Sequence, residues 1–372
     1  MKFDTVIIGG GLAGLTAGIC LQKARRTTAV ISTGQSALHF FSGAFETLGN
    51  DTRTIELFGE AGIRLHYREG WRLMPLGSFR EATLSLEDIR FFEERKVGRK
   101  ALILNFLGYS DFFPEFIAEG LRSTGTACRT GILRIPEVEV LRLSPSEVRS
   151  VHIARAMDKV WEKVVQEIRL LHRDEDVIIL PQVFGLSDPT VPGQLQGAVP
   201  AKVIFAGTLP PSVPGIRTQW QLRRRYEVLG GTFLLGDEAR EAVFDGPVLK
   251  QILTRNLGAH PLEADHFILA SGSFFSKGLS SSPTGIREPL FGLDVSASSD
   301  RNAWYDADFH ADQPYMGFGV LTDSRLHALK DGRPLANLFA AGSILGATRP
   351  ELGSGAGLAI RSAFAITDFL TA

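Results

Sequence analysis

The stretch Phe3-Asp-Thr-Val-Ile-Ile-Gly-Gly-Gly-Leu-Ala-Gly14 decides the fold of this chain. Its first half, to Ile8, is a β-rich run typical of a buried parallel strand, and its second half matches the pattern G-x-G-x-x-G. Helical composition follows from Leu15 to Ala24, and Ala29 to Ile31 predicts a second strand. A strand, a glycine turn, a helix and a strand within about 30 residues predict a dinucleotide-binding unit.

Each glycine of the turn has a predicted role. Gly9 permits the tight turn, Gly11 lets the backbone approach a pyrophosphate, and Gly14 allows the helix to pack closely on the strand. The N-terminus of the helix then offers N–H groups and a positive dipole end to the phosphates. A glycine-rich turn without a ligand is the alternative interpretation.

The second strand lacks the acidic residue that normally binds the adenosine ribose. Ser32-Thr33-Gly34 stands in its place. A serine hydroxyl makes one such hydrogen bond without the charge-assisted grip of a carboxylate. The adenosine half of a dinucleotide would therefore be held less tightly, and both FAD and the mononucleotide FMN stay open.

Composition excludes several classes of protein. The chain has 372 residues, 44% of them hydrophobic, and a formal net charge of -1, which argues against non-specific nucleic-acid binding. Its two cysteines, Cys20 and Cys128, cannot ligate a four-cysteine iron–sulfur cluster, and they fit a reducing cytoplasm. The apolar stretch from Thr5 to Gln22 holds five glycines, so we interpret it as the nucleotide turn rather than as a membrane span.

Three later segments favour a flavoprotein over a nicotinamide dehydrogenase. A string of short strands begins at Gly231 and ends in His266-Phe-Ile-Leu-Ala-Ser-Gly272. Asn337-Leu-Phe-Ala-Ala-Gly-Ser343 resembles a second flavin fingerprint, with Ser343 where an acidic residue usually binds the ribitol chain. Gly353-Ser-Gly-Ala-Gly357 then opens a closing helix, whose dipole would favour the anionic reduced flavin. Alternatively, these glycines only allow close packing.

The predicted fold class is α/β: a Rossmann-like flavin or dinucleotide-binding fold with an inserted second α/β domain. Alternating strand-like and helical runs define the insertion, namely 100–107, 112–123, 148–171, 176–181 and 202–205. We predict a discontinuous flavin-binding domain from 1–50, 217–275 and 335–372, an inserted domain from 75–216, and a substrate-side cap segment from 276–334.

A set of longer segments is too unusual to be generic to flavoproteins. They are Gly34-Gln-Ser-Ala-Leu-His-Phe40, Ser42-Gly43, Pro75-Leu-Gly-Ser78, Ile135-Pro-Glu-Val-Glu-Val-Leu-Arg142, Ile153-Ala-Arg155, Thr208-Leu-Pro-Pro-Ser-Val213, Gly215-Ile-Arg217, Ala270-Ser-Gly-Ser-Phe-Phe-Ser276, Gly285-Ile-Arg-Glu-Pro289, Gly292-Leu-Asp-Val295 and Gly342-Ser-Ile-Leu-Gly346. Together they span almost the whole chain, which resembles the B subunit of the anaerobic glycerol-3-phosphate dehydrogenase.

The resemblance implies a flavoprotein, usually assigned FMN, that works with the catalytic A subunit and the iron–sulfur C subunit of the same dehydrogenase. That complex oxidises sn-glycerol 3-phosphate, a small phosphorylated polyol, to dihydroxyacetone phosphate and passes electrons to a quinone. With two cysteines, this chain would pass its electrons to another polypeptide, so its expected share is an electron relay. We expect a cytoplasmic protein that reaches the inner face of the cell membrane through a partner subunit.

The residues predicted to contact the flavin come from the turns described above. They are Gly9, Gly11, Leu12, Ala13, Gly14, Ser32, Thr33, Ser42, Gly43, Gly272, Gly342, Ser343, Gly355, Ala356 and Gly357.

Oxidation of an alcohol by a flavin needs a base for the hydroxyl proton and cations for a phosphate. The candidate base is His39, with a loop histidine bonded to backbone as the alternative. The candidate cations are Arg287, which could instead pair with Glu288 or Asp294, and Arg217 after the Pro-Pro turn. We interpret Arg223-Arg-Arg225 as a solvated face or a partner contact. Asp308 and His310 lack a third ligand, so no metal is assigned.

Two other functions stay open. One is a free-standing flavin oxidoreductase of the fumarate-reductase or ketosteroid-dehydrogenase kind, which would need a complete proton-delivery set between residues 276 and 335. The other is a non-catalytic flavin-fold docking subunit, favoured by serines at positions 32 and 343 where acidic residues are expected.

Overall fold

The computed structural model describes residues 1–34, 36–144, 148–346, 349 and 353–372. By its internal contacts the chain divides into two units. The first unit comprises residues 1–38, 56–62 and 219–372, and the second comprises residues 39–55 and 63–218. The division into a flavin-binding domain, an inserted domain and a substrate-side cap segment assigns a function to each part. These assignments remain predictions.

The first unit is built on a parallel sheet in the order β10-β2-β1-β13-β17. Its strands are β1 (Lys2–Ile8), β2 (Thr28–Ser32), β10 (Thr232–Leu235), β13 (Leu262–Leu269) and β17 (Arg333–Ala340). Three strands are added antiparallel, namely β11 (Ala239–Asp245) and β12 (Val248–Thr254) beside β13, and β16 (His327–Lys330) beside β17. This sheet confirms the predicted α/β class, with every sequence-predicted strand of the nucleotide-binding frame in place.

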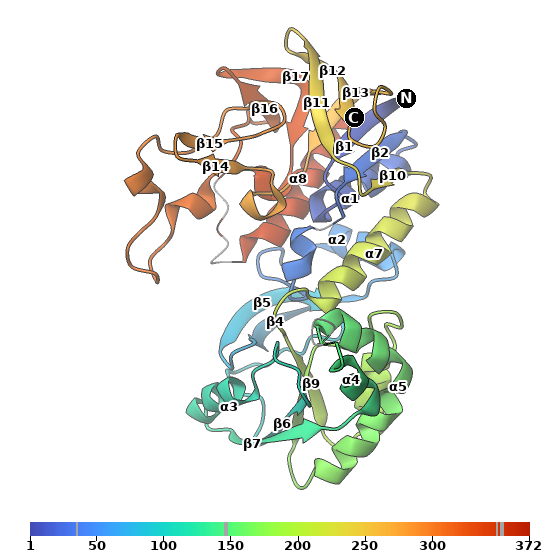
Figure 1. Cartoon of the computed structure of the whole chain (residues 1–372), viewed down its shortest axis with the longest axis vertical. Coiled ribbons are helices and arrows are strands. Elements are labelled where there is room, and N and C mark those ends of the chain that lie inside the picture. The colour runs from blue at the N-terminus through green and yellow to red at the C-terminus, as the bar shows by residue number, and fades with distance from the viewer. Residues whose placement is uncertain (35, 145–147, 347–348, 350–352) are drawn as a thin grey trace. The chain divides into compact units, whose positions relative to one another are not determined.

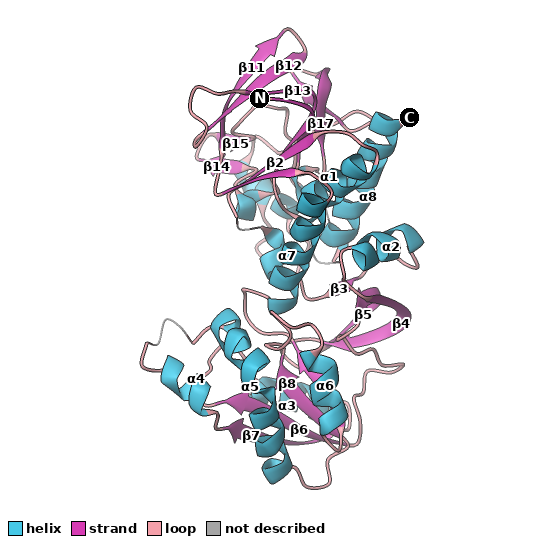
Figure 2. Cartoon of the chain, turned by 90° about the vertical axis from the view of Figure 1, so that its right-hand side faces the viewer, coloured by secondary structure: helices cyan, strands magenta, loops and turns pink. Residues whose placement is uncertain are grey.

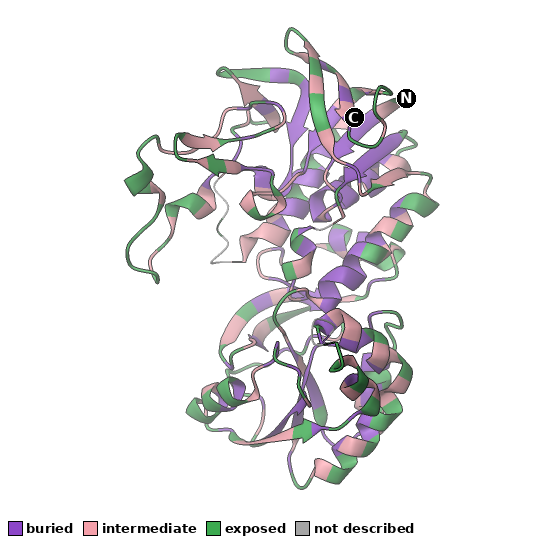
Figure 3. Cartoon of the chain, in the orientation of Figure 1, coloured by how far each residue is buried: buried purple, intermediate pink, exposed green. Residues whose placement is uncertain are grey.

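Both faces of this sheet are covered, which explains why β1 is a continuous apolar run. Ile7 faces the helix α1 (Leu12–Lys23), close to Gly14 and Gly18. Val6 and Ile8 point the other way, into a cluster of buried side chains around β12, β13 and β17. Figure 3 shows the resulting buried strands at the centre of this unit.

Helix α8 (Ser354–Thr371) packs beside α1, as Figure 2 shows. The residues of two other helices, α2 (Thr52–Glu60) and α7 (Val213–Val228), are shared between the two units. Between β13 and β16 the chain has little regular structure apart from a short hairpin of β14 (Ser280–Ser282) and β15 (Gly285–Arg287). Among the described residues, no helix has both the length and the apolar character to cross a membrane.

The second unit holds a four-stranded parallel sheet in the order β7-β6-β8-β9. Its strands are β6 (Lys100–Phe106), β7 (Ala127–Leu133), β8 (Val177–Pro181) and β9 (Lys202–Ala206), and its helices are α3 (Pro114–Ser123), α4 (Pro136–Leu141), α5 (Ser150–Leu171) and α6 (Val191–Ala198). Figure 1 shows α3 on one side of this sheet and α5 on the other. The structure confirms the strands and helices predicted here and adds β7 and the short helices α4 and α6.

A small antiparallel sheet, which the sequence pattern did not predict, also belongs to the second unit. It has the order β3-β5-β4, with β3 at Ala44–Phe45, β4 at Leu65–Leu73 and β5 at Phe79–Leu86. A buried ion pair between Arg72 and Glu46 ties it together.

Candidate flavin site

The glycine turn after β1 is locked against the end of β13. Gly9 has a φ of +124°, which disfavours any other residue, and a β-carbon there would overlap the carbonyl oxygen of Ala270. The N–H of Ala270 in turn donates to the carbonyl oxygen of Ile8 at 2.8 Å. The glycine turn from Gly9 to Gly14 and the segment that ends at Gly272 therefore meet here.

Gly11 and Gly14 differ in what surrounds them. A β-carbon on Gly14 would overlap the carbonyl oxygen of Gly9 and would lie 3.2 Å from Cγ2 of Ile7, so α1 and β1 need this glycine in order to pack. Among the described residues, a β-carbon on Gly11 would meet only Cβ of Ser36, at the ordinary contact distance of 3.5 Å. Because the protein's own packing does not require a glycine at position 11, the open space beside it fits the close approach of a phosphate.

The segment from Asn337 to Ser343 also reaches this turn. Gly342 has a φ of +77°, and a β-carbon on it would lie 2.9 Å from Cβ of Ala13. Its N–H donates to Oγ of Ser362 in α8 at 2.9 Å. A β-carbon on Gly272 would lie 3.6 Å from Oγ of Ser343. The structure thus brings four predicted cofactor residues together from three distant segments.

Two helix N-termini belong to this region. In the part of the chain that the structure describes, neither α1, which starts after Gly11, nor α8, which starts after Gly353, has a side chain capping its first turn. Their N–H groups and positive dipole ends are suited to negative charge. Among the described residues, nothing lies within 4 Å of a β-carbon built on Gly355, so the start of α8 is also open. Ala356 and Gly357 follow in the same turn.

Ser32 ends β2 beneath the glycine turn. It is 5% exposed, and its hydroxyl oxygen accepts the N–H of Gly34 at 3.2 Å. A β-carbon on Gly10 would lie 2.5 Å from that oxygen. The carboxylate of Asp237, which follows the neighbouring strand β10, is bound by the hydroxyl of Thr254 and two backbone N–H groups. The end of β2 therefore presents a hydroxyl rather than a carboxylate, and Thr33 beyond it is exposed.

Arg287 lies at the end of β15 with an exposed side chain. The two carboxylates considered as its partners are held elsewhere. Glu288 is 2% exposed and accepts the N–H groups of Leu290 and Phe291, and burial raises its pKa above the ordinary value. Asp294 accepts the N–H groups of residues 331 and 332. The proposed role of Arg287 in oxyanion capture stays a prediction.

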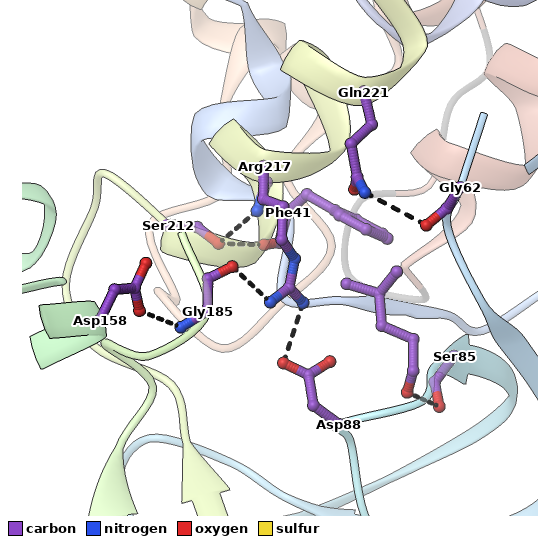
Figure 4. A network of polar contacts seen from close by, with 11 residues as sticks. Phe41, Gly62, Ser85, Asp88, Asp158, Gly185, Ser212, Arg217 and Gln221 are labelled. Carbon is purple, nitrogen blue, oxygen red and sulfur yellow. Dashed lines mark hydrogen bonds and ion pairs between the residues drawn. The ribbon is translucent and has the colours of Figure 1, made fainter. Parts of the chain in front are cut away.

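Four other predicted site residues belong to the second unit: His39, Ser42, Gly43 and Arg217. Arg217 is buried, and its guanidinium donates to Oδ2 of Asp88 and to the carbonyl oxygen of Gly185, both at 2.9 Å (Figure 4). The carbonyl oxygen of His39 accepts the N–H of Ser212 at 2.7 Å. The roles of these four residues stay predictions.

The charged clusters that the sequence did not assign to the site have local partners. Arg223 pairs with Glu227, and Arg225 pairs with Glu60. The carboxylate of Asp308 accepts the N–H of His310 in a local turn. Within the part of the chain that the structure describes, no three His, Cys, Asp or Glu side chains gather as a metal site would require.

A pocket of about 690 Å³ in the first unit was not predicted from the sequence. We name it the aromatic pocket, and its lining residues are Phe274, Ser281, Ile286, Arg301, Asn302, Trp304, Tyr305 and Tyr315. The signal available in the sequence was the density of aromatic residues between Trp304 and Tyr315, without helical or strand periodicity.

Replacing Gly11 by alanine should separate ligand binding from folding. The φ of −87° at this position suits alanine, and the added β-carbon makes one ordinary contact with the described residues. We expect thermal stability to change by less than about 1 kcal/mol, while flavin affinity falls at least about tenfold because the methyl group fills the phosphate space. Differential scanning calorimetry and flavin titration measure the two quantities. Unchanged flavin affinity would show that Gly11 does not face the ligand.

Comparison with known proteins agrees with this geometry. The family described as FAD binding domain matches residues 4–60 and 52–358. The fold and the site therefore define a protein of the FAD-binding class, which confirms the predicted flavin and favours FAD over FMN.

Full-length relatives narrow the family further. The anaerobic glycerol-3-phosphate dehydrogenase B subunit of Pectobacterium atrosepticum is 35% identical over 413 residues, covering 99% of this chain and 98% of the relative. The protein of that name from Histophilus somni strain 2336 is 34% identical over 423 residues, covering 99% and 98%. This chain belongs to the B-subunit family of the anaerobic glycerol-3-phosphate dehydrogenase, which confirms the resemblance found in its sequence.

Among solved structures, the L-proline dehydrogenase from P. horikoshii aligns with 100% of this chain and 93% of its own, at 12% identity and a TM-score of 0.39. A likeness of this size carries no argument about function.

Proposed function

We propose that this chain is the flavin-carrying subunit of a glycerol-3-phosphate dehydrogenase assembly and relays electrons between a catalytic subunit and an iron–sulfur subunit. The observation that carries the proposal is the meeting of Gly9 to Gly14, Gly272 and Gly342–Ser343 at one edge of a parallel sheet. Ligands of open α/β sheets bind outside the carboxyl ends of the strands, where these turns lie. The names of the relatives supply the reaction and the membership of a multi-subunit enzyme.

Each turn has a part in holding the cofactor. The glycine turn and the N-terminus of α1 would bind the phosphates, and the hydroxyl of Ser32 would bind the ribose. Ser343 and the start of α8 would lie toward the ribitol chain and the flavin ring. The flavin supplies the redox chemistry, accepting an electron pair and releasing electrons.

The small number of cysteines supports the proposed relay role. Cys20 lies on α1 in the first unit and Cys128 on β7 in the second. Since a four-cysteine cluster needs more thiolates than the two present, electrons leaving a flavin here would pass to a cluster on another polypeptide. The same partner would bring the chain to the membrane surface.

An absorption spectrum of the purified full-length chain tests the proposal, with the released cofactor identified by chromatography. We expect a yellow protein that holds about one flavin per chain, and we expect that flavin to be FAD. FMN would instead indicate that Ser32 cannot hold the adenosine half. A colourless protein that binds neither flavin would contradict the proposal and leave the docking role.

The same preparation can distinguish an electron-relay subunit from an enzyme that oxidises the substrate by itself. We expect glycerol 3-phosphate to bleach the flavin only when the catalytic subunit is present. Bleaching by the isolated chain would place substrate oxidation here and would favour the free-standing oxidoreductase.

A further inference from the structure

We propose that the aromatic pocket binds a flat, ring-containing ligand with one anionic or carbonyl group, and not a phosphorylated polyol. The inference deepens the proposed function, because it assigns a second ligand class to the flavin-carrying unit. It rests on the chemistry of the pocket's walls, on its size and on its attachment to the flavin site.

Four aromatic side chains dominate the walls, namely Phe274, Trp304, Tyr305 and Tyr315. The indole of Trp304 is fixed, because its Nε1–H donates to the carbonyl oxygen of Ser298 at 2.7 Å. Its ring centroid also lies 6.4 Å from that of Phe318, in a T-shaped arrangement. Tyr305 and Tyr315 remain 59% and 40% exposed. Rigid rings that keep apolar faces open to solvent are suited to stacking on another ring.

Among the described lining residues, polar groups are few. Arg301 brings the one cationic side chain among them, and its guanidinium lies 5.4 Å from the centre of the Trp304 ring. Asn302 and Ser281 add an amide and a hydroxyl. This set fits a single oxyanion or carbonyl at the edge of a ring. A polyol phosphate would need several cations and donors, and it would make little use of the aromatic walls.

The size agrees with this ligand class. A volume of about 690 Å³ lies within the range of pockets that enclose molecules of several rings, which are lined mainly by apolar and aromatic side chains with a few polar groups. A three-carbon phosphate would fill only a small part of it.

The pocket is attached to the candidate flavin site at two points within the first unit. Phe274 follows Gly272 by two residues, and a β-carbon built on Gly272 would lie 3.6 Å from the hydroxyl oxygen of Ser343. At the other end of the segment, the N–H of Val320 donates to the carbonyl oxygen of Ile344 at 2.8 Å, directly after Ser343. The segment that forms the pocket therefore begins and ends at the two turns that carry the predicted flavin contacts.

Isothermal titration of the flavin-loaded full-length chain with anthraquinone-2-sulfonate tests the proposal, because this probe is flat, tricyclic and singly anionic. We expect saturable binding that Tyr305→Ser weakens roughly two- to tenfold through loss of a stacking ring. Arg301→Gln should lower the affinity for this probe about tenfold. The affinity for neutral 1,4-naphthoquinone should stay within about twofold of the wild-type value. Phe309→Ser is the matched control, since Phe309 is 88% exposed in the same segment and does not line the pocket.

Three results would overturn the inference. The first is an absence of saturable probe binding, or equal affinities in the wild type and in both pocket variants. The second is glycerol 3-phosphate binding that Arg301→Gln abolishes. The third is probe binding only to flavin-free chain, because the pocket would then hold the ring of the cofactor itself. The visible spectrum of each preparation reports flavin separately: a chain that stays colourless even after either flavin is added, yet binds the probe through Tyr305 and Arg301, contradicts the proposed function and supports the pocket.

Discussion

Replacing Gly14 by alanine should remove flavin binding and destabilise the first unit at the same time. The added β-carbon would overlap the carbonyl oxygen of Gly9, which is backbone and cannot rotate away. Helix α1 must therefore move off β1, at a cost of about 1–3 kcal/mol or more for an overpacked core. Moving α1 also displaces its N-terminus and the turn that approaches the phosphates, so we expect flavin affinity to fall at least about 100-fold.

Gly59→Ala is the matched control for this variant. Gly59 lies in α2, and nothing among the described residues lies within 4 Å of a β-carbon built there. Alanine at an open helical position stabilises by up to about 1 kcal/mol. Calorimetry and bound flavin per chain compare the two variants. A Gly14→Ala chain that melts with the wild type and keeps its flavin would show that the helix–strand contact does not position the site.

Breaking a buried ion pair of the second unit should lower its stability strongly without touching the glycine turn. Arg217 and Asp88 form this pair, with side chains only 8% and 11% exposed. In Asp88→Ala the guanidinium stays buried with the carbonyl oxygen of Gly185 as its remaining partner. An uncompensated buried charge costs about 3–5 kcal/mol, so we expect a lower melting temperature of the second unit.

Two further variants show whether the effect comes from charge burial. Glu87 neighbours Asp88 and pairs with Arg64 at the surface, with side chains 62% and 80% exposed, so Glu87→Ala should cost less than about 1 kcal/mol. The double variant Asp88→Leu with Arg217→Met removes both charges and should recover most of the lost stability. A double variant as unstable as Asp88→Ala would mean that the pair provides more than charge compensation.

The sequence predicts this fold well where the determining contacts are local. The glycines from Gly9 to Gly14 lie next to the strand and helix that they connect, so their spacing alone identifies the βαβ unit. Resemblance to flavin fingerprints then indicates the turns at Gly272 and Ser343, which the structure brings together.

Contacts between distant, irregular segments escape such prediction. Arg217 and Asp88 are 129 residues apart, and no pattern in either segment identifies the other. The aromatic pocket combines a hairpin with short 3₁₀ turns, whose side chains follow neither helical nor strand periodicity. The sheet that contains β4 and β5 was not predicted either, and its register has a bulge between Tyr67 and Gly70.

The order of strands in the first unit has a consequence for synthesis on the ribosome. Lys2 in β1 pairs with Glu263 in β13, and Phe267 in β13 pairs with Leu338 in β17. The βαβ start of the chain, although made first, therefore waits for nearly the entire chain before its sheet can close. The parallel sheet of the second unit is contiguous from Lys100 to Ala206 and can form while the rest is still being translated. The candidate cofactor site is thus the last part of the molecule to become complete. Until then β1 is an exposed strand edge, and such edges promote aggregation of a nascent chain.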